Sequence, residues 1–178
     1  MLAKFKPTWM INSIYNISPN RLKQLGVKAV LSDLDNTIVP WNNKNATPQL
    51  INWLNQLKHE HIIFIIISNN KGKRIARVVQ DLKLPFIGRA LKPLPFGILR
   101  ALKSFHLDKD NVIMVGDQLL TDIPAANFCH VRSVLVKPLV ATDPWNTRIN
   151  RFFEKKLKKR LLKIYPELHW QEDINGHK

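Results

Sequence analysis

The sequence has a single cysteine, Cys129, so no disulfide can form within the chain. No cysteine–histidine spacing matches a structural zinc site, and the six histidines form no H-E-x-x-H pattern. These absences exclude a disulfide scaffold and the usual zinc sites. A lone thiol is also typical of a reducing cytoplasm.

Long apolar segments are missing as well. The longest uninterrupted apolar run covers residues 62–67, whereas a helix needs ~20 apolar residues to cross a bilayer. The first residues also lack the apolar core of a secretory signal. We therefore expect neither a membrane span nor a secretory signal, although the chain can still lie on a membrane surface.

Acidic residues are scarce, because 13 of them face 28 basic residues and leave a net charge of +15. A field of this sign attracts nucleic acid, anionic membrane surface and phosphorylated substrates without choosing among them. The 178 residues, 45% of them hydrophobic, suit one globular domain spanning 1–178.

Short apolar segments alternate with helical ones from residue 27 onward. We expect strands at 27–33, 62–67, 111–115 and 131–136 and a short extended segment near 86–87. We expect helices at about 47–59, 72–83, 94–106 and 119–128, and a helix start at Ser18–Pro19 within the scattered apolar positions of 1–26. This alternation predicts a doubly wound, Rossmann-like α/β fold, with a parallel sheet covered by helices on both faces.

Polar clusters follow the expected strands. In a doubly wound fold, ligands bind beyond the carboxyl ends of the strands, so these clusters are expected at one edge of the sheet. The clusters are Asp33-Leu34-Asp35-Asn36-Thr37, Ser68-Asn69-Asn70, Leu91-Lys92-Pro93, and Gly116-Asp117 with Asp122.

Each cluster supplies a group that phosphoryl transfer requires. One carboxylate of the Asp33–Asp35 pair can attack phosphorus while the other handles the proton of the leaving group. Mg²⁺ prefers carboxylate oxygens, water and substrate phosphate, and Asp33 and Asp117 can provide the carboxylates. The hydroxyl of Ser68, the ammonium of Lys92 and backbone N–H groups at helix starts can bind phosphoryl oxygens. The clusters therefore predict a site that neutralises the charge of a phosphoryl group during an in-line displacement.

In this order, the clusters resemble the four motifs of the haloacid-dehalogenase (HAD) superfamily. Asp33 to Thr37 resembles motif I, D-x-D-x-T, and Ser68 and Lys92 resemble motifs II and III. Gly116-Asp117 with Asp122 resembles motif IV, G-D-x-x-x-x-D, so the resemblance covers residues 27–136. Each motif is weak alone, but four in order, each behind an expected strand, are a specific signal.

The resemblance implies a role for each matching residue. Asp33 would be the nucleophile that forms an aspartyl-phosphate, Asp35 the general acid and base, and Lys92 the group that balances the charge of the nucleophile and the phosphate. The residues that would contact substrate are Thr37, Ser68, Asn69 and Lys92. The residues that would hold Mg²⁺ are Asp33, Asp35 through its backbone carbonyl, Asp117 and Asp122.

Plainer interpretations exist for the same residues. Asp33 and Asp35 can be turn acids, Ser68 a helix N-cap, Lys92 a solvated surface lysine, and Asp122 a structural hydrogen-bond acceptor. A response-regulator receiver domain also gathers acids, a hydroxyl and a Lys-Pro pair around magnesium. Its acidic pair is adjacent rather than D-x-D, and no lone aspartate ends the second or third expected strand here, so we reject that fold.

The spaces between the motifs leave no room for a separately folded cap domain, which would need ~50 residues or more. An uncapped site suits a phosphate carried on something large, such as a lipid headgroup, a protein or a nucleic acid. Residues 144–164 predict a basic amphipathic helix with apolar positions at 149, 153, 157, 161 and 164. Such a helix either binds an anionic membrane surface or packs on the domain with its lysines solvated. Its basic residues are Arg148, Arg151, Lys155, Lys156, Lys158, Lys159, Arg160 and Lys163.

Beyond the superfamily, the chain is similar to the YqeG-type phosphatases of the capless subfamily IIIA, which are similar to mitochondrial phosphatidylglycerophosphate phosphatases. This resemblance implies a cytoplasmic enzyme of phospholipid biosynthesis that contacts the inner membrane face peripherally. The alternatives are a phosphatase of another phosphate ester or of a phosphoprotein, and a basic nucleic-acid- or ribosome-associated binding protein. The segments that carry the similarity are Trp9-Met10-Ile11, Gly26-Val27-Lys28, the motif I region through Pro40-Trp41, Ser68-Asn69-Asn70 and Ala90-Leu91-Lys92-Pro93.

Overall fold

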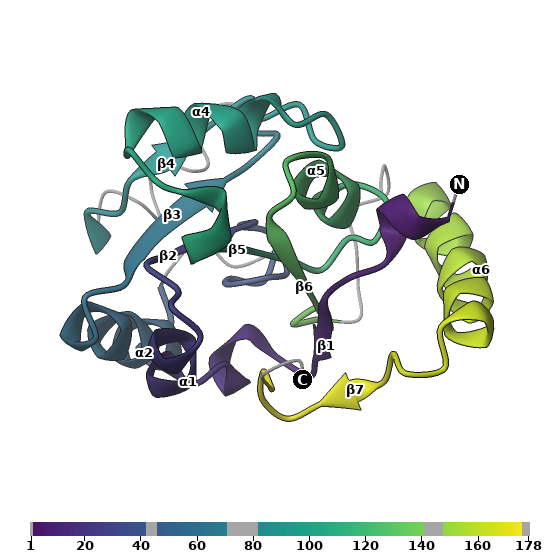
Figure 1. Ribbon diagram of the computed structural model, residues 1–178, viewed down its shortest axis with the longest axis horizontal. Helices are drawn as coiled ribbons and strands as arrows, with labels where there is room; N and C mark the ends of the chain where they lie inside the picture. The colour runs from purple at the N-terminus through teal and green to yellow at the C-terminus, as the bar shows by residue number, and fades with distance from the viewer. Residues whose placement is uncertain (1, 42–45, 71–81, 141–147, 176–178) are drawn as a thin grey trace.

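The computed structural model describes residues 2–41, 46–70, 82–140 and 148–175. Among these residues, a seven-stranded parallel sheet has the order β4-β3-β2-β5-β6-β1-β7 (Figure 1). The expected doubly wound parallel sheet is therefore present. The strands are β1 (Trp9–Ile11), β2 (Ala29–Ser32), β3 (Ile63–Ile67), β4 (Phe86–Ile87), β5 (Val112–Gly116), β6 (Arg132–Val136) and β7 (Trp170–Gln171).

The helices begin where the sequence provides caps. The Ser18 and Thr47 side chains accept hydrogen bonds from the third residue beyond them, and a proline follows each cap as the first helical residue. The helix expected at 72–83 lies outside the described residues except for its last two positions. The α-helices are α1 (Pro19–Gln24), α2 (Pro48–His59), α4 (Phe96–Ser104), α5 (Asp122–Phe128) and α6 (Arg148–Ile164), and the 3₁₀ turns are η1 (Ala3–Phe5), η2 (Ile14–Asn16) and η3 (Lys109–Asn111).

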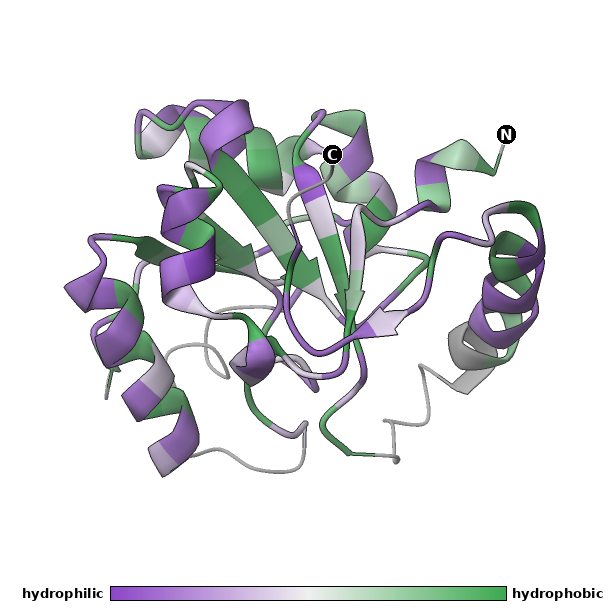
Figure 2. Cartoon of the chain, turned by 60° about the horizontal axis from the view of Figure 1, so that its bottom comes forward, coloured by the Kyte–Doolittle hydropathy of each residue, from purple (hydrophilic) through white to green (hydrophobic). Residues whose placement is uncertain are grey.

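Alternate residues of the central strands are buried on opposite faces of the sheet. Val30 of β2 packs in a core with α1 and α2, to which Trp53 contributes its ring. Its neighbour Leu31 packs in a second core with α4 and α5, beside Ile98. Figure 1 shows these two helix pairs on opposite sides of the sheet, and Figure 2 shows the apolar character of the strands between them. Burial on both faces explains why the strands are continuously apolar.

Two strands were not expected from the sequence. β1 pairs with β6, with Met10 opposite Leu135, and β7 pairs with the other edge of β1, with Met10 opposite Trp170. The sheet therefore contains two strands more than the sequence predicted. Segments of three and two residues are too short to show a strand period, so only tertiary pairing defines them.

Helix α6 packs on the domain through one face. Leu157 and Leu161 join a third core with Met10, Leu119 and Ile123, and Leu161 is only 2% exposed. The packing interpretation of the basic helix is therefore confirmed for this face. Three large apolar side chains of α6 nevertheless lie exposed to solvent, namely Phe152, Phe153 and Ile164.

Nothing in the described parts of the segment between Asp33 and Lys92 folds as a separate cap. Residues 33–41, 46–70 and 82–92 form the motif I turn, α2, β3 and β4, which all belong to the sheet and its covering layer.

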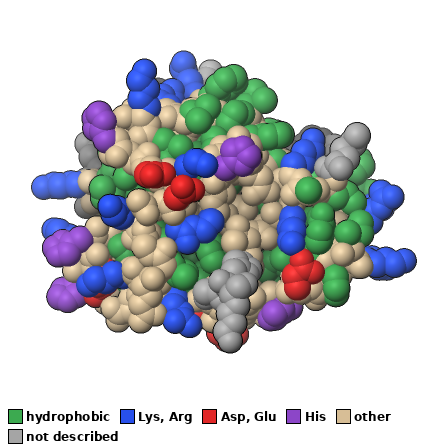
Figure 3. Space-filling view, in the orientation of Figure 1, with side chains coloured by type: hydrophobic (Ala, Val, Ile, Leu, Met, Phe, Trp, Pro, Cys, Tyr) green, Lys and Arg blue, Asp and Glu red, His purple; other side chains and the backbone are tan. Residues whose placement is uncertain are grey.

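Of the helices that the structure describes, none combines the length and the apolar character that a bilayer crossing requires. In the space-filling view, hydrophobic side chains gather over α4 and α5 (Figure 3).

The thiol of Cys129 gives the first test of this packing. The side chain is 6% exposed, and burial raises the pKa of the thiol to about 11. At pH 8 only about 0.1% would be thiolate, the form that alkylating reagents attack. We expect iodoacetamide to leave Cys129 unmodified in the native protein and to label it in urea, as measured by intact mass. Equal labelling rates in both conditions would contradict the described burial.

Candidate active site

The register of three neighbouring strands brings motifs I, II and IV together. β2 lies between β3 and β5, and Ser32 at its end is opposite Ile66 on one side and Val115 on the other. The next residue, Asp33, donates its backbone N–H to Val115 O at 2.9 Å. Ser68 and Asp117 directly follow the ends of β3 and β5. The parallel strands therefore deliver these side chains to one edge of the sheet, as expected.

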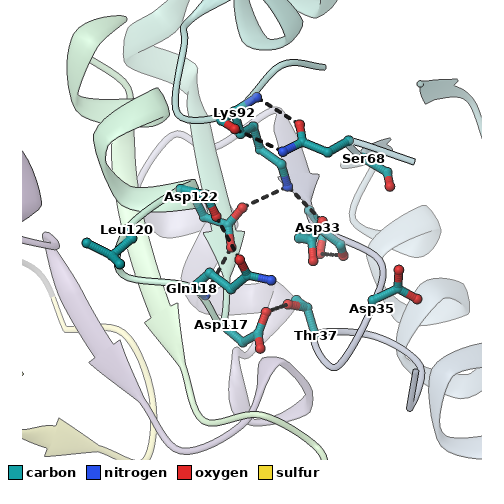
Figure 4. Close-up of polar contacts among 12 residues, drawn as sticks. Asp33, Asp35, Thr37, Ser68, Lys92, Asp117, Gln118, Leu120 and Asp122 are labelled. Atoms are coloured by element: carbon teal, nitrogen blue, oxygen red, sulfur yellow. Dashed lines mark hydrogen bonds and ion pairs between the residues drawn. The ribbon is translucent and has the colours of Figure 1, made fainter. Parts of the chain in front are cut away.

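A buried lysine completes this edge. The Lys92 Nζ atom lies 2.7 Å from Asp33 Oδ1 and 2.7 Å from Asp122 Oδ1. Figure 4 shows the ammonium between the two carboxylates. Lys92 is 6% exposed, so the interpretation as a solvated surface lysine is wrong.

Charge and burial oppose each other at these groups. Burial favours a neutral Lys92, but the charges of Asp122 and Asp33 outweigh it and raise the lysine pKa, so the ammonium stays charged. Burial is also the main reason why the pKa of Asp122 is raised to about 6, with Lys92 opposing this shift and Asp33 reinforcing it. The site therefore concentrates negative charge that its own lysine compensates only in part.

The backbone of Lys92 is held by the side chain of Asn69. Asn69 Oδ1 accepts a hydrogen bond from Lys92 N at 2.8 Å, and Asn69 Nδ2 donates to Lys92 O at 2.9 Å. Asn69 was expected to contact substrate, but its amide is engaged with the peptide groups of Lys92. In this arrangement Asn69 positions the lysine across the edge between β3 and the loop that follows β4.

The loop after β5 fixes Asp122 against a glycine. A Cβ atom on Gly116 would lie 2.2 Å from Asp122 Oδ2, so this position has no room for a side chain. Gln118 N donates to the same Oδ2 at 3.0 Å. Asp122 therefore accepts structural hydrogen bonds and pairs with Lys92 at the same time.

The motif I turn bends back toward β5. Asn36 adopts a positive φ of 63°, and its backbone N–H donates to Val39 O. The next residue, Thr37, donates its hydroxyl to Asp117 Oδ1 at 3.1 Å. Thr37, expected to contact substrate, here orients a carboxylate of motif IV.

Asp35 lies at the rim of this cluster, apart from the Lys92–Asp122 pair (Figure 4). Asp35 Oδ2 accepts a hydrogen bond from Asn70 Nδ2 at 2.7 Å. Ser68 is 2% exposed, and its Oγ accepts from Asn70 N at 3.1 Å. The residues after Asn70 fall outside the described part of the chain, so the N-cap interpretation of Ser68 stays a prediction.

Sequence reasoning gave no role to Glu154, the one acid within the basic helix. Its side chain is buried, and Oε1 accepts a hydrogen bond from Leu120 N at 3.0 Å. Leu120 belongs to the loop between Asp117 and Asp122, so α6 is tied directly to motif IV. A lone acid at the centre of a basic segment was the available signal.

Three buried carboxylates can share one cation. Single oxygens of Asp33, Asp117 and Asp122 all lie within 4.8 Å of one another. Hard divalent cations favour oxygen ligands of this kind, and a cation among these carboxylates would relieve the repulsion between their like charges. The residues present therefore fit a divalent metal, and the side chain of Asp35 stands outside this group.

Comparisons with known proteins agree with this geometry. The HAD-hydrolase-like family profile matches residues 90–147. The probable phosphatase YqeG of Bacillus subtilis is 38% identical over 173 residues, which cover 97% of this chain and 100% of that protein. The chain belongs to the YqeG-type HAD phosphatases.

Solved structures share the HAD fold at low sequence identity. A hypothetical protein from Xanthomonas campestris has a TM-score of 0.55 and 19% identity, over 89% of this chain and 77% of that one. The cobalt-bound deoxy-D-mannose-octulosonate 8-phosphate phosphatase YrbI from Haemophilus influenzae has a TM-score of 0.52 and 14% identity, over 77% of this chain and 90% of that one. These likenesses support the HAD fold and no finer assignment.

Replacing Lys92 by methionine tests the charge balance of this HAD site. In metal-free protein at pH 8, the free energy of unfolding should fall by about 3–5 kcal/mol, because Asp33 and Asp122 lose their cation in a buried place. Burial already raises the pKa of Asp122 to about 6, above its value in the unfolded chain, and the loss of Lys92 removes a charge that opposes this shift. Part of the lost stability should therefore be recovered as the pH falls through the folded-state pKa of Asp122, and lost again as the pH rises.

The measurement is urea unfolding of wild type and Lys92→Met between pH 5.5 and 8. Lys103→Met, on the exposed part of α4, is the matched control and should follow wild type at every pH. Equal stability of Lys92→Met and wild type across this range would contradict the described ion pairs.

Proposed function

We propose that the protein is a Mg²⁺-dependent phosphomonoester hydrolase that works through an aspartyl-phosphate at Asp33. The observation that carries this proposal is the convergence of the Lys92 ammonium and the carboxylates of Asp33, Asp117 and Asp122 at one strand edge. Once a divalent cation is bound among these carboxylates, the arrangement suits a small anion such as a phosphoryl group. Mg²⁺ held by Asp33, Asp117 and the backbone carbonyl of Asp35, with Asp122 in support, would supply positive charge toward the phosphoryl oxygens.

The proposed reaction has two steps. A carboxylate oxygen of Asp33 attacks phosphorus, the bond from phosphorus to the ester oxygen breaks, and Asp35 gives its proton to that leaving oxygen. Asp35, now ionised, takes a proton from water, whose oxygen attacks phosphorus and breaks the bond to Asp33. Inorganic phosphate leaves, and both carboxyl groups return to their starting states.

The remaining polar groups have supporting roles in this proposal. Lys92 offsets the charge of Asp33 and the phosphoryl group, and Ser68 offers its buried hydroxyl beside them. Thr37 holds Asp117, and Asn69 holds the peptide groups of Lys92. Asn70 donates a hydrogen bond to Asp35 Oδ2 and so orients this carboxyl group.

The proposed substrate is phosphatidylglycerophosphate, dephosphorylated at the cytoplasmic face of the inner membrane. Capless strand ends leave the site open to a phosphate that is attached to a surface. The exposed aromatic side chains of α6 support contact with that surface, because Phe152 and Phe153 are more than half exposed. The Lys156 ammonium lies 4.4 Å from the centre of the Phe152 ring, so basic and aromatic groups lie together there. No feature of the described residues favours nucleic acid over an anionic lipid.

The first test replaces the nucleophile. Asp33→Asn should lower kcat for every phosphomonoester substrate by more than about 1,000-fold, because the amide cannot attack phosphorus. Asp110→Asn makes the same chemical change at an exposed position on η3 and should keep wild-type activity. Phosphate release is measured with and without Mg²⁺ on phosphatidylglycerophosphate in mixed micelles, a sugar phosphate and a mononucleotide. Brisk turnover of the soluble esters without the lipid would remove the lipid assignment and leave the enzyme class intact. Full activity of Asp33→Asn would refute the mechanism.

The second test concerns Phe152 and Phe153, the exposed aromatic side chains of α6. Wild type should bind vesicles that contain phosphatidylglycerol more tightly than neutral vesicles, and added salt should weaken this binding. Phe152→Ser with Phe153→Ser should weaken it at least tenfold, because each buried phenyl ring contributes about 1.5–3 kcal/mol. Phe96→Ser with Leu99→Ser, which removes exposed apolar groups from α4, is the control in the same sedimentation assay. An equal loss in both double variants would show that α6 is not the contact face.

A further inference from the structure

A pocket beside the proposed catalytic edge is not used by the mechanism above. Its volume is about 360 Å³, which falls in the range of ~300–1,000 Å³ typical of small-ligand sites. It lies between α6, the residues that follow β6, and β7. The polar and aromatic residues in its wall are Asp117, Lys137, Glu154, Lys155, Lys158 and Trp170.

Two lysines of this pocket converge on one indole ring. Lys137 Nζ lies 5.1 Å and Lys158 Nζ 5.6 Å from the centre of the Trp170 ring. Among the residues that the structure describes, neither ammonium has a carboxylate within 4.0 Å. Like charges repel one another, and an anion bound between the two ammonium groups would offset that repulsion. Lys155 adds a third positive charge to the same wall.

The acids of the pocket are engaged elsewhere. Glu154 Oε1 accepts the hydrogen bond of Leu120 N, and the Glu154 side chain is buried. Asp117 Oδ1 accepts the hydroxyl of Thr37 and belongs to the carboxylate cluster at the strand ends. The lysines therefore carry the positive charge that is available to a ligand.

Asp117 belongs both to the carboxylate cluster at the strand ends and to the lining of the pocket. It lines the pocket, and its carboxylate oxygen lies within 4.8 Å of an Asp33 oxygen. A ligand with one phosphate against Asp33 would therefore reach the pocket by extending past Asp117. Trp170 offers an apolar ring to the carbon atoms of such a linker.

We propose that Lys137 and Lys158 form a subsite for a second phosphate group of the substrate, while the phosphomonoester is held at Asp33. This inference rests on the proposed function and extends it, because it predicts that the enzyme prefers substrates with two phosphates joined by a short linker. The second phosphate can be a phosphodiester of a lipid headgroup or of a soluble molecule. The lysines recognise the same charged oxygens in both.

The experiment compares three substrates that share a glycerol phosphomonoester and differ in the groups attached to it. Glycerol 3-phosphate has one phosphomonoester. Glycerophosphoglycerophosphate adds a phosphodiester without acyl chains, and phosphatidylglycerophosphate in mixed micelles adds the lipid. We expect Lys137→Gln with Lys158→Gln to lower kcat/KM for the soluble two-phosphate substrate at least tenfold relative to that for glycerol 3-phosphate, mainly through KM.

The matched control is Lys28→Gln with Lys103→Gln, two exposed lysines outside this pocket, which should leave all three activities unchanged. An unchanged ratio in the Lys137/Lys158 variant would overturn the subsite. So would a loss confined to the micellar substrate, because the lysines would then act on the lipid surface.

Binding separates this inference from the proposed function. Glycerophosphoglycerol has the phosphodiester and no hydrolysable phosphomonoester, so its calorimetric Kd does not depend on turnover. We expect this Kd to rise at least tenfold in the Lys137/Lys158 variant. If wild type hydrolysed none of the substrates but showed this difference, the function would fail and the anion subsite would stand. If wild type were active and the Kd did not change, the subsite would fail alone.

Discussion

The contact between the Lys92 ammonium and two buried carboxylates is the interaction on which the rest of the site depends. Oxygens of Asp33, Asp117 and Asp122 lie within 4.8 Å of one another at low exposure, an arrangement that repulsion and desolvation both oppose. Lys92 lies 2.7 Å from two of these carboxylates and offsets part of that cost. The negative charge that Lys92 leaves uncompensated makes the same place suitable for a divalent cation, and a bound cation would in turn attract a phosphoryl group.

The parallel sheet makes this concentration of charge possible. Because β2 lies between β3 and β5, the residues after three strands meet at one edge, while the apolar strands themselves are covered on both faces. The rigid strands fix the positions of the acids, and local hydrogen bonds fix their orientations. Thr37 orients Asp117, and Asn69 holds the backbone of Lys92. Glu154 extends this order to α6 by binding the motif IV loop at Leu120 N.

Local patterns were informative where they coincide with the tertiary arrangement. The strand segments expected at 27–33, 62–67, 111–115 and 131–136 became β2, β3, β5 and β6, and the polar clusters behind them converge because carboxyl ends of parallel strands share an edge. β1 and β7 could not be predicted, since segments of three and two residues have no recognisable period. The hydrogen bonds of Asn69 and Glu154 join residues 23 and 34 positions apart. No local sequence pattern predicts contacts between residues that are so far apart in the chain.

The sequence by itself determined the fold class, the four motifs and the excess of positive charge, because these depend on residue type and on spacing along the chain. Only the tertiary structure decided which charged side chains lie next to one another. It paired Lys92 with Asp33 and Asp122, buried one face of α6, and brought Lys137 and Lys158 to the same indole ring. Electrostatic energy depends on distance in space and on burial, and the order of residues along the chain fixes neither.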